Sequence, residues 1–251
     1  MTTTQVAPTT TTLTLVRHGQ THLNARRVMQ GSCDSPLTRT GRAGVLVTAQ
    51  HLSTQTFDAA YSSPQGRAVM TAVEIVRHHD DLPLRSVQGL REFSFGRYER
   101  RPERELDEVE PWASFIPRVL SGEHPGLPGG ESGESIMGRV RATFAQIVDA
   151  HPDEHVLVVG HGLTLGAYLA TIDPTGLVPL PNASVSTVEV VREPGVDVSI
   201  SRILSVAVDV AGHGSLSARP APGPVEVGGS TAERVAAPLP GPPTADPVAG
   251  A

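Results

Sequence analysis

Short apolar runs alternate with segments of helical periodicity along the first two hundred residues. Three runs, Leu13–Val16, Phe57–Tyr61 and His155–Val159, have the length and composition of buried strands. Helical spacing predicts helices over Leu37–Leu52, from Pro64 to the cations at Arg77–His79, from a Ser132 cap through Val148, and after Gly160 through Leu169. Val185–Val191 and Val196–Leu204, joined at Pro194-Gly195, alternate as a hairpin does. This order predicts an α/β fold, a three-layer sandwich with a largely parallel central sheet.

Three segments depart from this pattern. Residues 97–130 are charged at first and turn-rich at the end, and we interpret them as a short inserted lid segment over the functional edge of the sheet. Residues 1–12 are rich in threonine, and residues 212–251 are rich in Pro, Ala and Gly. We expect both ends to be disordered, because such compositions bury little apolar surface. Residues 13–211 then form one domain.

Composition and charge narrow the function classes. A net charge of −6 argues against a general nucleic-acid binder, although all 20 basic residues are arginine, which suits phosphate recognition. Cys33 is the only cysteine, which favours a reducing, cytoplasmic location. Residues 1–12 do not resemble a secretory signal, and Val156–Ile172 is too short and polar for a membrane span. Neither nucleic acid nor a membrane is expected as a partner, and oligomeric state is not indicated.

Polar loops follow three of the predicted strands. They contain Arg17-His18-Gly19, Ser62-Ser63-Pro64 and Gly160-His161-Gly162. The carboxyl ends of parallel strands share one sheet edge, so these loops can form one site. Arginine and histidine donors could surround the charge of a transferring phosphoryl group, and nearby arginines would keep a histidine nucleophile neutral. Glu92 is our candidate for the acid that protonates the leaving group and then activates water.

The motifs occur in an order that resembles a known family. They are Arg17-His18-Gly19-Gln20-Thr21 through Asn24, Gln30-Gly31, Asp34-Ser35-Pro36-Leu37-Thr38, Ser62-Ser63-Pro64 with Arg67, Glu92 with Gly96, Gly130-Glu131-Ser132, and Gly160-His161-Gly162. Each is weak alone. Together, over about residues 13 to 191, they are similar to the histidine phosphatase (phosphoglycerate mutase-like) superfamily.

This resemblance implies roles for the matched positions. His18 would accept the phosphoryl group, with Glu92 as the proton donor. The other implied positions are Arg17, Arg67 and His161 in the phosphate pocket, and Thr21, Asn24, Gln30, Gly31 and Gly162 in phosphate or substrate binding. Members often have Glu-Gly where this chain has Glu99-Arg100, a departure that bears on the substrate entrance.

Several residues also have simpler interpretations. Glu92 could be a surface carboxylate paired with Arg91, and Arg67 could be solvated on the first turn of its helix. Cys33 and Arg39 have the spacing of a cysteine-dependent phosphatase, but the residues between them include no glycine. The histidines at 151, 155 and 161 lack a metal-binding pattern. We expect no metal and no cofactor.

The predicted reaction is hydrolysis of a small phosphorylated metabolite, a phosphomonoester, through a phosphohistidine. A mutase would need a longer, more basic insertion than residues 97–130, so phosphoglycerate mutase-type transfer is the alternative. Arg100, Arg101 and Arg104 could contact a second anionic group of the substrate, or could pair with Glu103, Glu105 and Asp107 on a solvated helix. A non-catalytic domain that binds a phospho-ligand or a partner is the third possibility.

Overall fold

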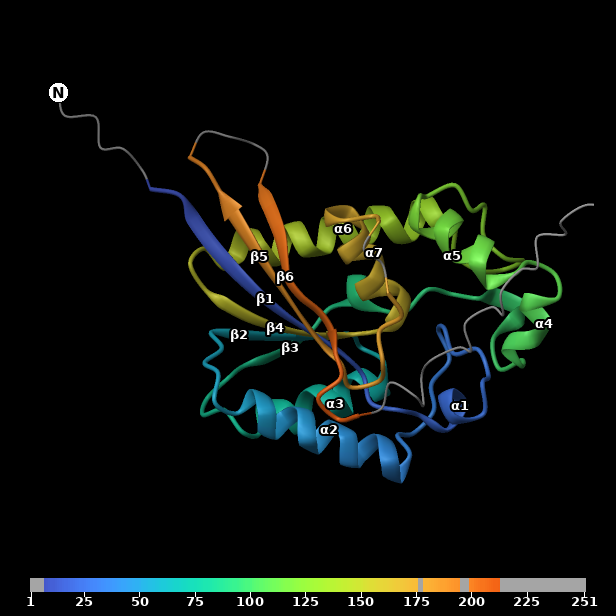
Figure 1. Cartoon of the computed structure of the whole chain (residues 1–251), viewed down its shortest axis with the longest axis horizontal. Helices are drawn as coiled ribbons and strands as arrows, with labels where there is room; N and C mark the ends of the chain where they lie inside the picture. The colour runs from blue at the N-terminus through green and yellow to red at the C-terminus, as the bar shows by residue number, and fades with distance from the viewer. Residues whose placement is uncertain (1–6, 176–177, 195–198, 213–251) are drawn as a thin grey trace, which may run out of the picture. The chain divides into compact units, whose positions relative to one another are not determined.

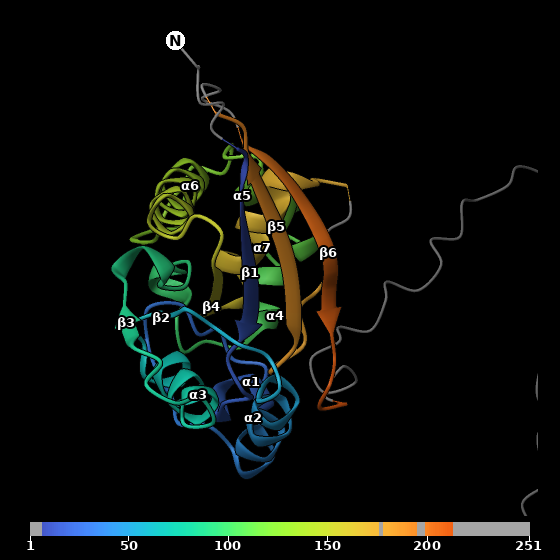
Figure 2. The ribbon, with the colours of Figure 1, turned by 90° about the vertical axis from the view of Figure 1, so that its left-hand side faces the viewer.

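Six strands form the central sheet of the protein. A computed structural model describes residues 7–175, 178–194 and 199–212. The strands are β1 (Thr9–Arg17), β2 (Ala59–Ser62), β3 (Leu84–Ser86), β4 (His155–Gly160), β5 (Val185–Arg192) and β6 (Ile200–Val208). Their order is β3-β2-β4-β1-β5-β6, with β6 at one edge and β3 at the other (Figure 2). The first four are parallel, and β5 pairs antiparallel with both β1 and β6.

Helices cover both faces of this sheet (Figure 1). The pair α2 (Arg39–Leu52) and α3 (Gly66–Val76) lies on one face, and the pair α6 (Gly133–Ala150) and α7 (Gly162–Ile172) lies on the other. The predicted three-layer α/β fold is therefore confirmed. Thr38 caps α2 and Ser132 caps α6 through their hydroxyl groups, which explains where these helices begin.

Strand β4 shows why its sequence is a continuous apolar run. Val156 and Val158 pack with the α6 and α7 core, whereas Leu157 and Val159 pack with the α2 and α3 core. Side chains of a strand alternate between faces, so a central strand covered on both sides needs apolar residues at every position. The predicted strand at His155–Val159 is confirmed and extends to Gly160.

Some predicted strand boundaries were wrong, and one strand was not predicted. β1 begins at Thr9 rather than Leu13, because Thr9–Thr12 pair with Glu189–Arg192 of β5, and threonine suits a pleated strand. β6 spans Ile200–Val208 rather than Val196–Leu204, and Gly195 of the expected turn lies outside the described residues together with 196–198 of the expected strand. β3 was not predicted. The expectation of disorder over residues 1–12 was wrong for Thr9–Thr12, which belong to β1, whereas residues 1–6 and 213–251 lie outside the described residues.

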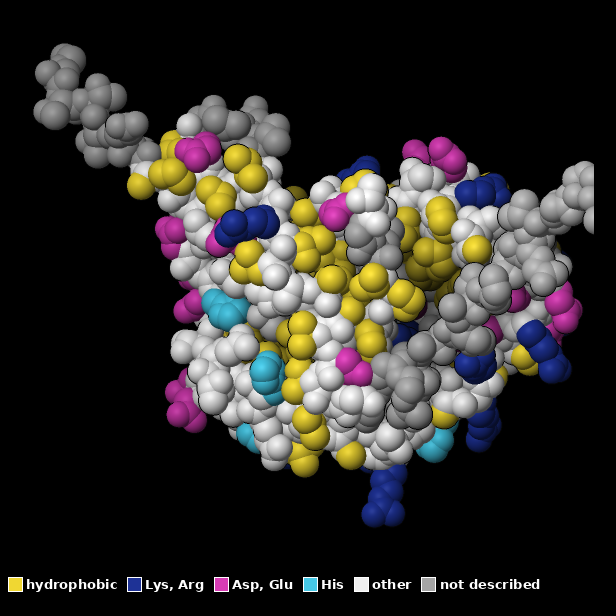
Figure 3. All heavy atoms as spheres, viewed as in Figure 1, with side chains coloured by type: hydrophobic (Ala, Val, Ile, Leu, Met, Phe, Trp, Pro, Cys, Tyr) yellow, Lys and Arg dark blue, Asp and Glu magenta, His cyan; other side chains and the backbone are white. Residues whose placement is uncertain are grey.

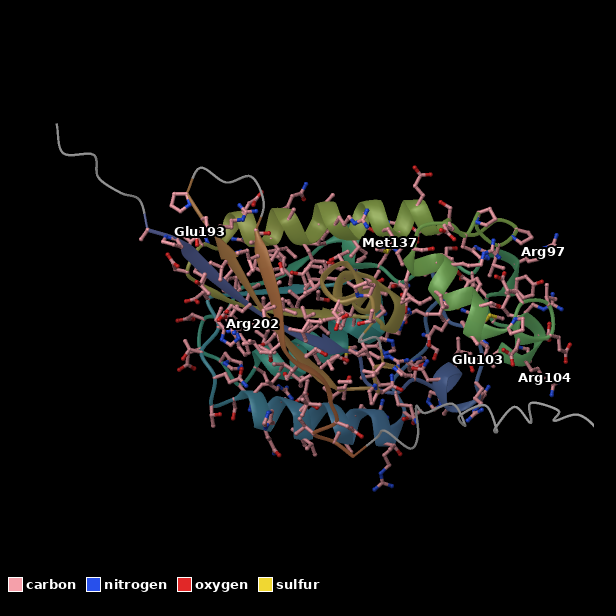
Figure 4. All side chains as sticks on the ribbon, turned by 45° about the horizontal axis from the view of Figure 1, so that its top comes forward. Arg97, Glu103, Arg104, Met137, Glu193 and Arg202 are labelled. Atoms are coloured by element: carbon pink, nitrogen blue, oxygen red, sulfur yellow. The ribbon has the colours of Figure 1, made fainter. Side chains whose placement is uncertain are left out.

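The inserted segment 97–130 contains two short helices, α4 (Glu103–Asp107) and α5 (Trp112–Leu120). Its buried side chains, including Phe115 and Val119, join the core beneath α6 and α7. Its first residues lie beside the loop after α1 (His22–Ala25), where Val28 and Pro102 form an isolated β-bridge. Arg97 and Arg104 lie at this end of the domain, and Glu193 lies at the opposite end (Figure 4).

The outer face of β6 is partly apolar. Ile200, Leu204 and Val208 are exposed on this edge strand, and hydrophobic side chains are visible over β6 and α7 (Figure 3). No helix in the described part of the chain is long and apolar enough to cross a membrane. Residues 156–172 form a strand that leads into a helix, as predicted.

Candidate active site

The three polar loops meet at the carboxyl edge of the parallel strands. The register pairs Arg17 with Gly160 and Ser62 with Val159. The following amides continue the ladder, because His18 N–H donates to the Gly160 carbonyl and Ser63 N–H donates to the Val159 carbonyl, each at 3.0 Å. The rings of His18 and His161 then lie edge to face with centroids 5.1 Å apart. The sheet thus brings together residues that are more than 140 positions apart in the sequence.

The hydrogen bonds of His18 define its tautomer. Its Nδ1 lies 2.8 Å from the carbonyl oxygen of Gly19, which can only accept a proton. On the other side of the ring, Arg67 Nε donates to His18 Nε2 at 3.3 Å. Nδ1 therefore carries the hydrogen and Nε2 carries the lone pair. The ring is neutral, 3% exposed, and has its basic nitrogen among cationic neighbours.

The surroundings of His18 keep it neutral. Burial lowers the pKa of His18 well below its ordinary value of 6.5, and the charges of Arg67 and Arg17 lower it further. Burial and the same two arginines also lower the pKa of His161. This local cationic cluster exists in a protein of net charge −6.

This pKa shift predicts the pH dependence of activity. Only the neutral imidazole of His18 has a lone pair to donate, so activity should decline only as the pH falls through the lowered pKa. The acidic limb of a kcat/KM profile, which reports the free enzyme, should therefore have its midpoint well below 6.5. Steady-state assays across the acidic range, with unfolding monitored by circular dichroism at each pH, measure it. A midpoint at or above 6.5 would contradict this environment for His18.

Arg67 is held by the loop that follows α1. Its side chain is fully buried, with Nη2 donating to Gly31 O at 3.0 Å and Nη1 donating to Cys33 O at 2.9 Å and Asp34 Oδ1 at 3.0 Å. The solvated alternative for Arg67 is therefore wrong. Because both terminal nitrogens are engaged, the guanidinium has a fixed orientation toward His18.

Two buried nitrogens at this edge have no hydrogen-bond partner in the described part of the chain. They are Arg17 Nε and His161 Nδ1. The Ser63 hydroxyl lies 2.7 Å from His161 Nε2, a shorter contact than its 3.4 Å to Gln65 Oε1, so we assign its proton to the bond with His161. His161 Nδ1 is then an N–H donor, as is Arg17 Nε. Buried donors without partners are costly, and an anionic ligand would satisfy both.

Glu92 is anchored at the start of α7. Its Oε2 accepts the Leu163 N–H at 3.2 Å, and its Oε1 accepts the Thr164 N–H at 3.1 Å, while the Thr164 hydroxyl donates to the Arg91 carbonyl at 2.7 Å. Its expected alternative partner, Arg91, instead lies 3.7 Å from Glu131, so the surface-pair interpretation of Glu92 is wrong. These backbone donors fix the position of the Glu92 carboxyl group at the N-terminus of α7.

Thr21, Asn24 and Gln30 form a hydrogen-bonded unit beside His18. Thr21 caps α1, and its hydroxyl donates to Gln30 Oε1 at 2.6 Å. The Asn24 Oδ1 accepts the Thr21 N–H at 3.2 Å and the Asn182 amide at 3.4 Å. These contacts use the oxygen of the Asn24 amide, so its NH₂ group is the part that can donate to a ligand.

Gly31 and Gly162 lie where a side chain would crowd neighbouring atoms of the site. A Cβ on Gly162 would lie 3.5 Å from Arg17 Nε, in the space beside that free donor. A Cβ on Gly31 would overlap the Phe93 carbonyl oxygen and approach Glu99 Oε1 to 2.7 Å. The Gly31 carbonyl meanwhile accepts from Arg67. Gly31 thus contributes its backbone to the site.

Gly31→Ala should destabilise the protein. Its Cβ would displace backbone atoms, which typically lowers the free energy of unfolding by about 1–3 kcal/mol. The matched control is Gly138→Ala in α6, where no heavy atom lies within 4 Å of the added Cβ. That change should raise stability by roughly 0.5–1 kcal/mol, because alanine favours a helix interior. Urea unfolding of both variants gives the comparison, and equal stabilities would contradict the close packing at Gly31.

The cysteine alternative is inconsistent with the surroundings of Cys33. Burial and the charge of Glu99 raise the pKa of the thiol, which disfavours the thiolate. The amides of Ser32 and Cys33 both donate to the Glu99 carboxylate at 2.8 Å. These two N–H groups are therefore already used and do not form a phosphate-binding loop. The neighbouring Arg100 has φ +63°, the left-handed region that favours glycine.

The other histidines have separate partners. His151 contacts Tyr61 and Glu154, and His155 contacts Thr14. Within residues 7–175, 178–194 and 199–212, no three His, Cys, Asp or Glu side chains form a group that could hold a metal ion. In the insertion, Arg101 pairs with Glu105, as one of the two interpretations predicted.

Four contributors to the site were not assigned from the sequence. Ser63 orients His161, and the Thr164 N–H holds the Glu92 carboxylate while its hydroxyl holds the Arg91 carbonyl. Gln65 contacts the segments that carry Gly31 and Glu92, and Asn182 donates to the His18 carbonyl at 3.1 Å. Ser63 lay inside a motif that we had recognised, but the other three carry no local signal of their contacts.

The fold and the site together define an α/β protein whose sheet edge presents a neutral imidazole among buried cationic donors, an arrangement suited to a phosphoryl group. Residues 13–198 match the model of the histidine phosphatase superfamily (branch 1). The chain belongs to this superfamily.

Named relatives include both mutases and phosphatases. A probable phosphoglycerate mutase GpmB of Yersinia enterocolitica is 34% identical over 189 residues, which covers 72% of this chain and 85% of that protein. The structure of Bacillus stearothermophilus YhfR is 29% identical with a TM-score of 0.67, covering 80% of this chain and 99% of YhfR. A mycobacterial glucosyl-3-phosphoglycerate phosphatase is 25% identical with a TM-score of 0.68, covering 80% of this chain and all of that one.

Proposed function

We propose that this protein hydrolyses a small phosphorylated metabolite, a phosphomonoester, through a phosphohistidine at His18. The observation that carries the proposal is the lone pair at His18 Nε2, held beside Arg67 by the bond from Nδ1 to the Gly19 carbonyl. A nucleophile with a fixed tautomer needs no proton transfer before it attacks phosphorus. A cytoplasmic location remains our expectation from the single cysteine.

The first step forms the bond between His18 Nε2 and phosphorus and breaks the ester bond. Arg17 Nε and His161 Nδ1 donate to the phosphoryl oxygens, on which negative charge is spread, and Arg67 Nε turns from His18 Nε2 to these oxygens as Nε2 bonds to phosphorus. Asn24 and the loop that contains Gln30 and Gly31 complete the pocket. A dianionic phosphate beside Glu92 favours the protonated carboxyl, which then gives its proton to the leaving alkoxide.

The second step restores the free histidine. The Glu92 carboxylate, now ionised, accepts a proton from water as the water oxygen attacks phosphorus and the bond to Nε2 breaks. Inorganic phosphate leaves. The anchoring of Glu92 by α7 suits this base role, because the Leu163 and Thr164 amides hold the carboxyl group in place between the two proton transfers.

The insertion favours hydrolysis over mutase chemistry. A mutase must retain a bisphosphorylated intermediate, which calls for free cationic groups over the site. Here Arg101 pairs with Glu105, and Arg118 pairs with Glu110. Two of the five arginines in the insertion are thus paired with carboxylates within it, which reduces the positive charge that the insertion can offer to a second phosphate. The mutase names of the relatives are the reason to test transfer directly.

A panel of phosphorylated metabolites, assayed for released phosphate, tests the proposal, with isomerisation of phosphoglycerate measured in parallel. We expect phosphate release and an acid-labile, base-stable phosphate that mass spectrometry of rapidly quenched enzyme locates at His18. Efficient isomerisation without net phosphate release would replace the hydrolase with a mutase. Phosphate trapped at Cys33, or no turnover of any phosphomonoester, would overturn the mechanism.

A further inference from the structure

Gln65 connects the segments that carry the catalytic groups, although it contacts none of the reacting atoms. It lies immediately before α3, two residues ahead of Arg67. Its side-chain Nε2 donates to the Gly31 carbonyl at 2.6 Å, and its Oε1 accepts the Glu92 N–H at 2.8 Å. Its backbone N–H donates to the Ser63 hydroxyl at 3.3 Å.

Each partner of Gln65 holds a different group of the site. The Gly31 carbonyl also accepts from Arg67 at 3.0 Å, and the Ser63 hydroxyl contacts His161 at 2.7 Å. Glu92 is the acid itself, and its peptide N–H is the atom that Gln65 holds. Glu92 follows the 3₁₀ turn Gln88–Leu90. The Gln65 amide therefore connects the segment that carries Glu92 to the loop that lines the phosphate pocket.

The two ends of the Gln65 amide are not interchangeable. The oxygen must face the Glu92 N–H, and the NH₂ group must face the Gly31 carbonyl. An aliphatic side chain of similar size would leave the Glu92 N–H without this bond, which lets the backbone at Glu92 shift, whereas the Gly31 carbonyl would still accept from Arg67. Displacement of a catalytic group by about 1 Å can cost on the order of a hundredfold in rate.

We infer that Gln65 is a positioning residue that sets the place of the Glu92 carboxyl relative to the phosphate pocket, an inference that rests on the proposed function. Gln65 should matter for proton donation to the leaving group and much less for attack by His18. The two steps can be separated by the choice of substrate. A nitrophenolate leaves without a proton, whereas the alkoxide of an alkyl phosphate needs one.

The test compares Gln65→Leu with wild type on p-nitrophenyl phosphate and β-glycerophosphate. Single-turnover rates should fall by about tenfold to a hundredfold for the alkyl ester, and by less than about threefold for the aryl ester. Gln65→Met, which also lacks the amide, should behave in the same way and provides a second variant if the first does not fold. An equal loss on both substrates, or no loss on either, would overturn the role of Gln65.

Tyr61→Phe is the matched control. It removes a buried side-chain hydrogen bond, the 2.8 Å contact with His151, outside the site. It should change both rates by the same small factor, because general destabilisation does not distinguish leaving groups. Phosphohistidine trapping on wild type distinguishes failure of the proposed function from failure of the positioning role of Gln65. Wild type without phosphohistidine defeats the proposed function, whereas phosphohistidine together with a substrate-independent Gln65→Leu defect defeats only the positioning role.

Discussion

His18→Ala is expected to lower kcat/KM for p-nitrophenyl phosphate by roughly 10⁴-fold or more, the scale seen when a catalytic nucleophile is removed. His18 Nε2 is the nitrogen whose lone pair lies beside Arg67, and alanine leaves no group there to attack phosphorus. The neighbouring arginines would still bind phosphate, so affinity for inorganic phosphate should fall far less than turnover. Steady-state kinetics and competitive inhibition by phosphate measure the two effects separately.

His51→Ala is the control for this substitution. His51 is exposed in the last turn of α2, and its removal should leave turnover within about twofold of wild type. Circular dichroism of both variants checks that they fold. Turnover by His18→Ala at the wild-type rate would exclude a phosphohistidine at this position.

Glu92→Gln is expected to lower kcat for alkyl phosphates by about 10²–10⁴-fold, the usual contribution of general acid–base catalysis. The amide has nearly the same shape, but it can neither protonate an alkoxide nor accept a proton from water. Because attack by His18 on an aryl ester needs no acid, the phosphohistidine should still form and then persist. Rapid-quench experiments with p-nitrophenyl phosphate should show a burst of nitrophenolate followed by slow turnover.

Glu123→Gln provides the comparison for this change. Glu123 is an exposed carboxylate of the insertion, and its neutralisation should leave kcat unchanged within experimental error. A Glu92→Gln variant that turns over alkyl phosphates at the wild-type rate would remove Glu92 from the mechanism. Another carboxylate would then have to supply the proton.

The fold could largely be predicted from the sequence where elements are long and covered on both faces. The apolar run at β4 and the helical spacing in α6 indicated their elements because burial imposes a regular pattern. The short edge strand β3 and helix α5 of the insertion were not predicted, whereas a helix at Glu103–Asp107 was one of the two interpretations of that segment. Leu84–Ser86 is too short to show a period, and α4 and α5 are stabilised mainly by contacts with distant residues such as those of the core under α6.

The ends of strands were predicted less well than their centres. Thr9–Thr12 join β1 because β5 offers a partner for their backbone groups, and nothing local in a threonine run requires it. The same reasoning applies to β6, whose register is set by pairing with β5. Pairing between strands is decided by the tertiary structure.

The sequence by itself indicated which residues come together in the candidate site. His18, Arg67, Glu92 and His161 each stand in a recognisable motif, and three of the motifs follow strands that share one sheet edge. Only the tertiary structure decided the protonation of His18 and the anchoring of Glu92. A tautomer is fixed by the group that accepts its hydrogen, and a carboxylate is held by the donors around it. For Glu92 those donors come from the start of α7, more than 70 residues away in the chain.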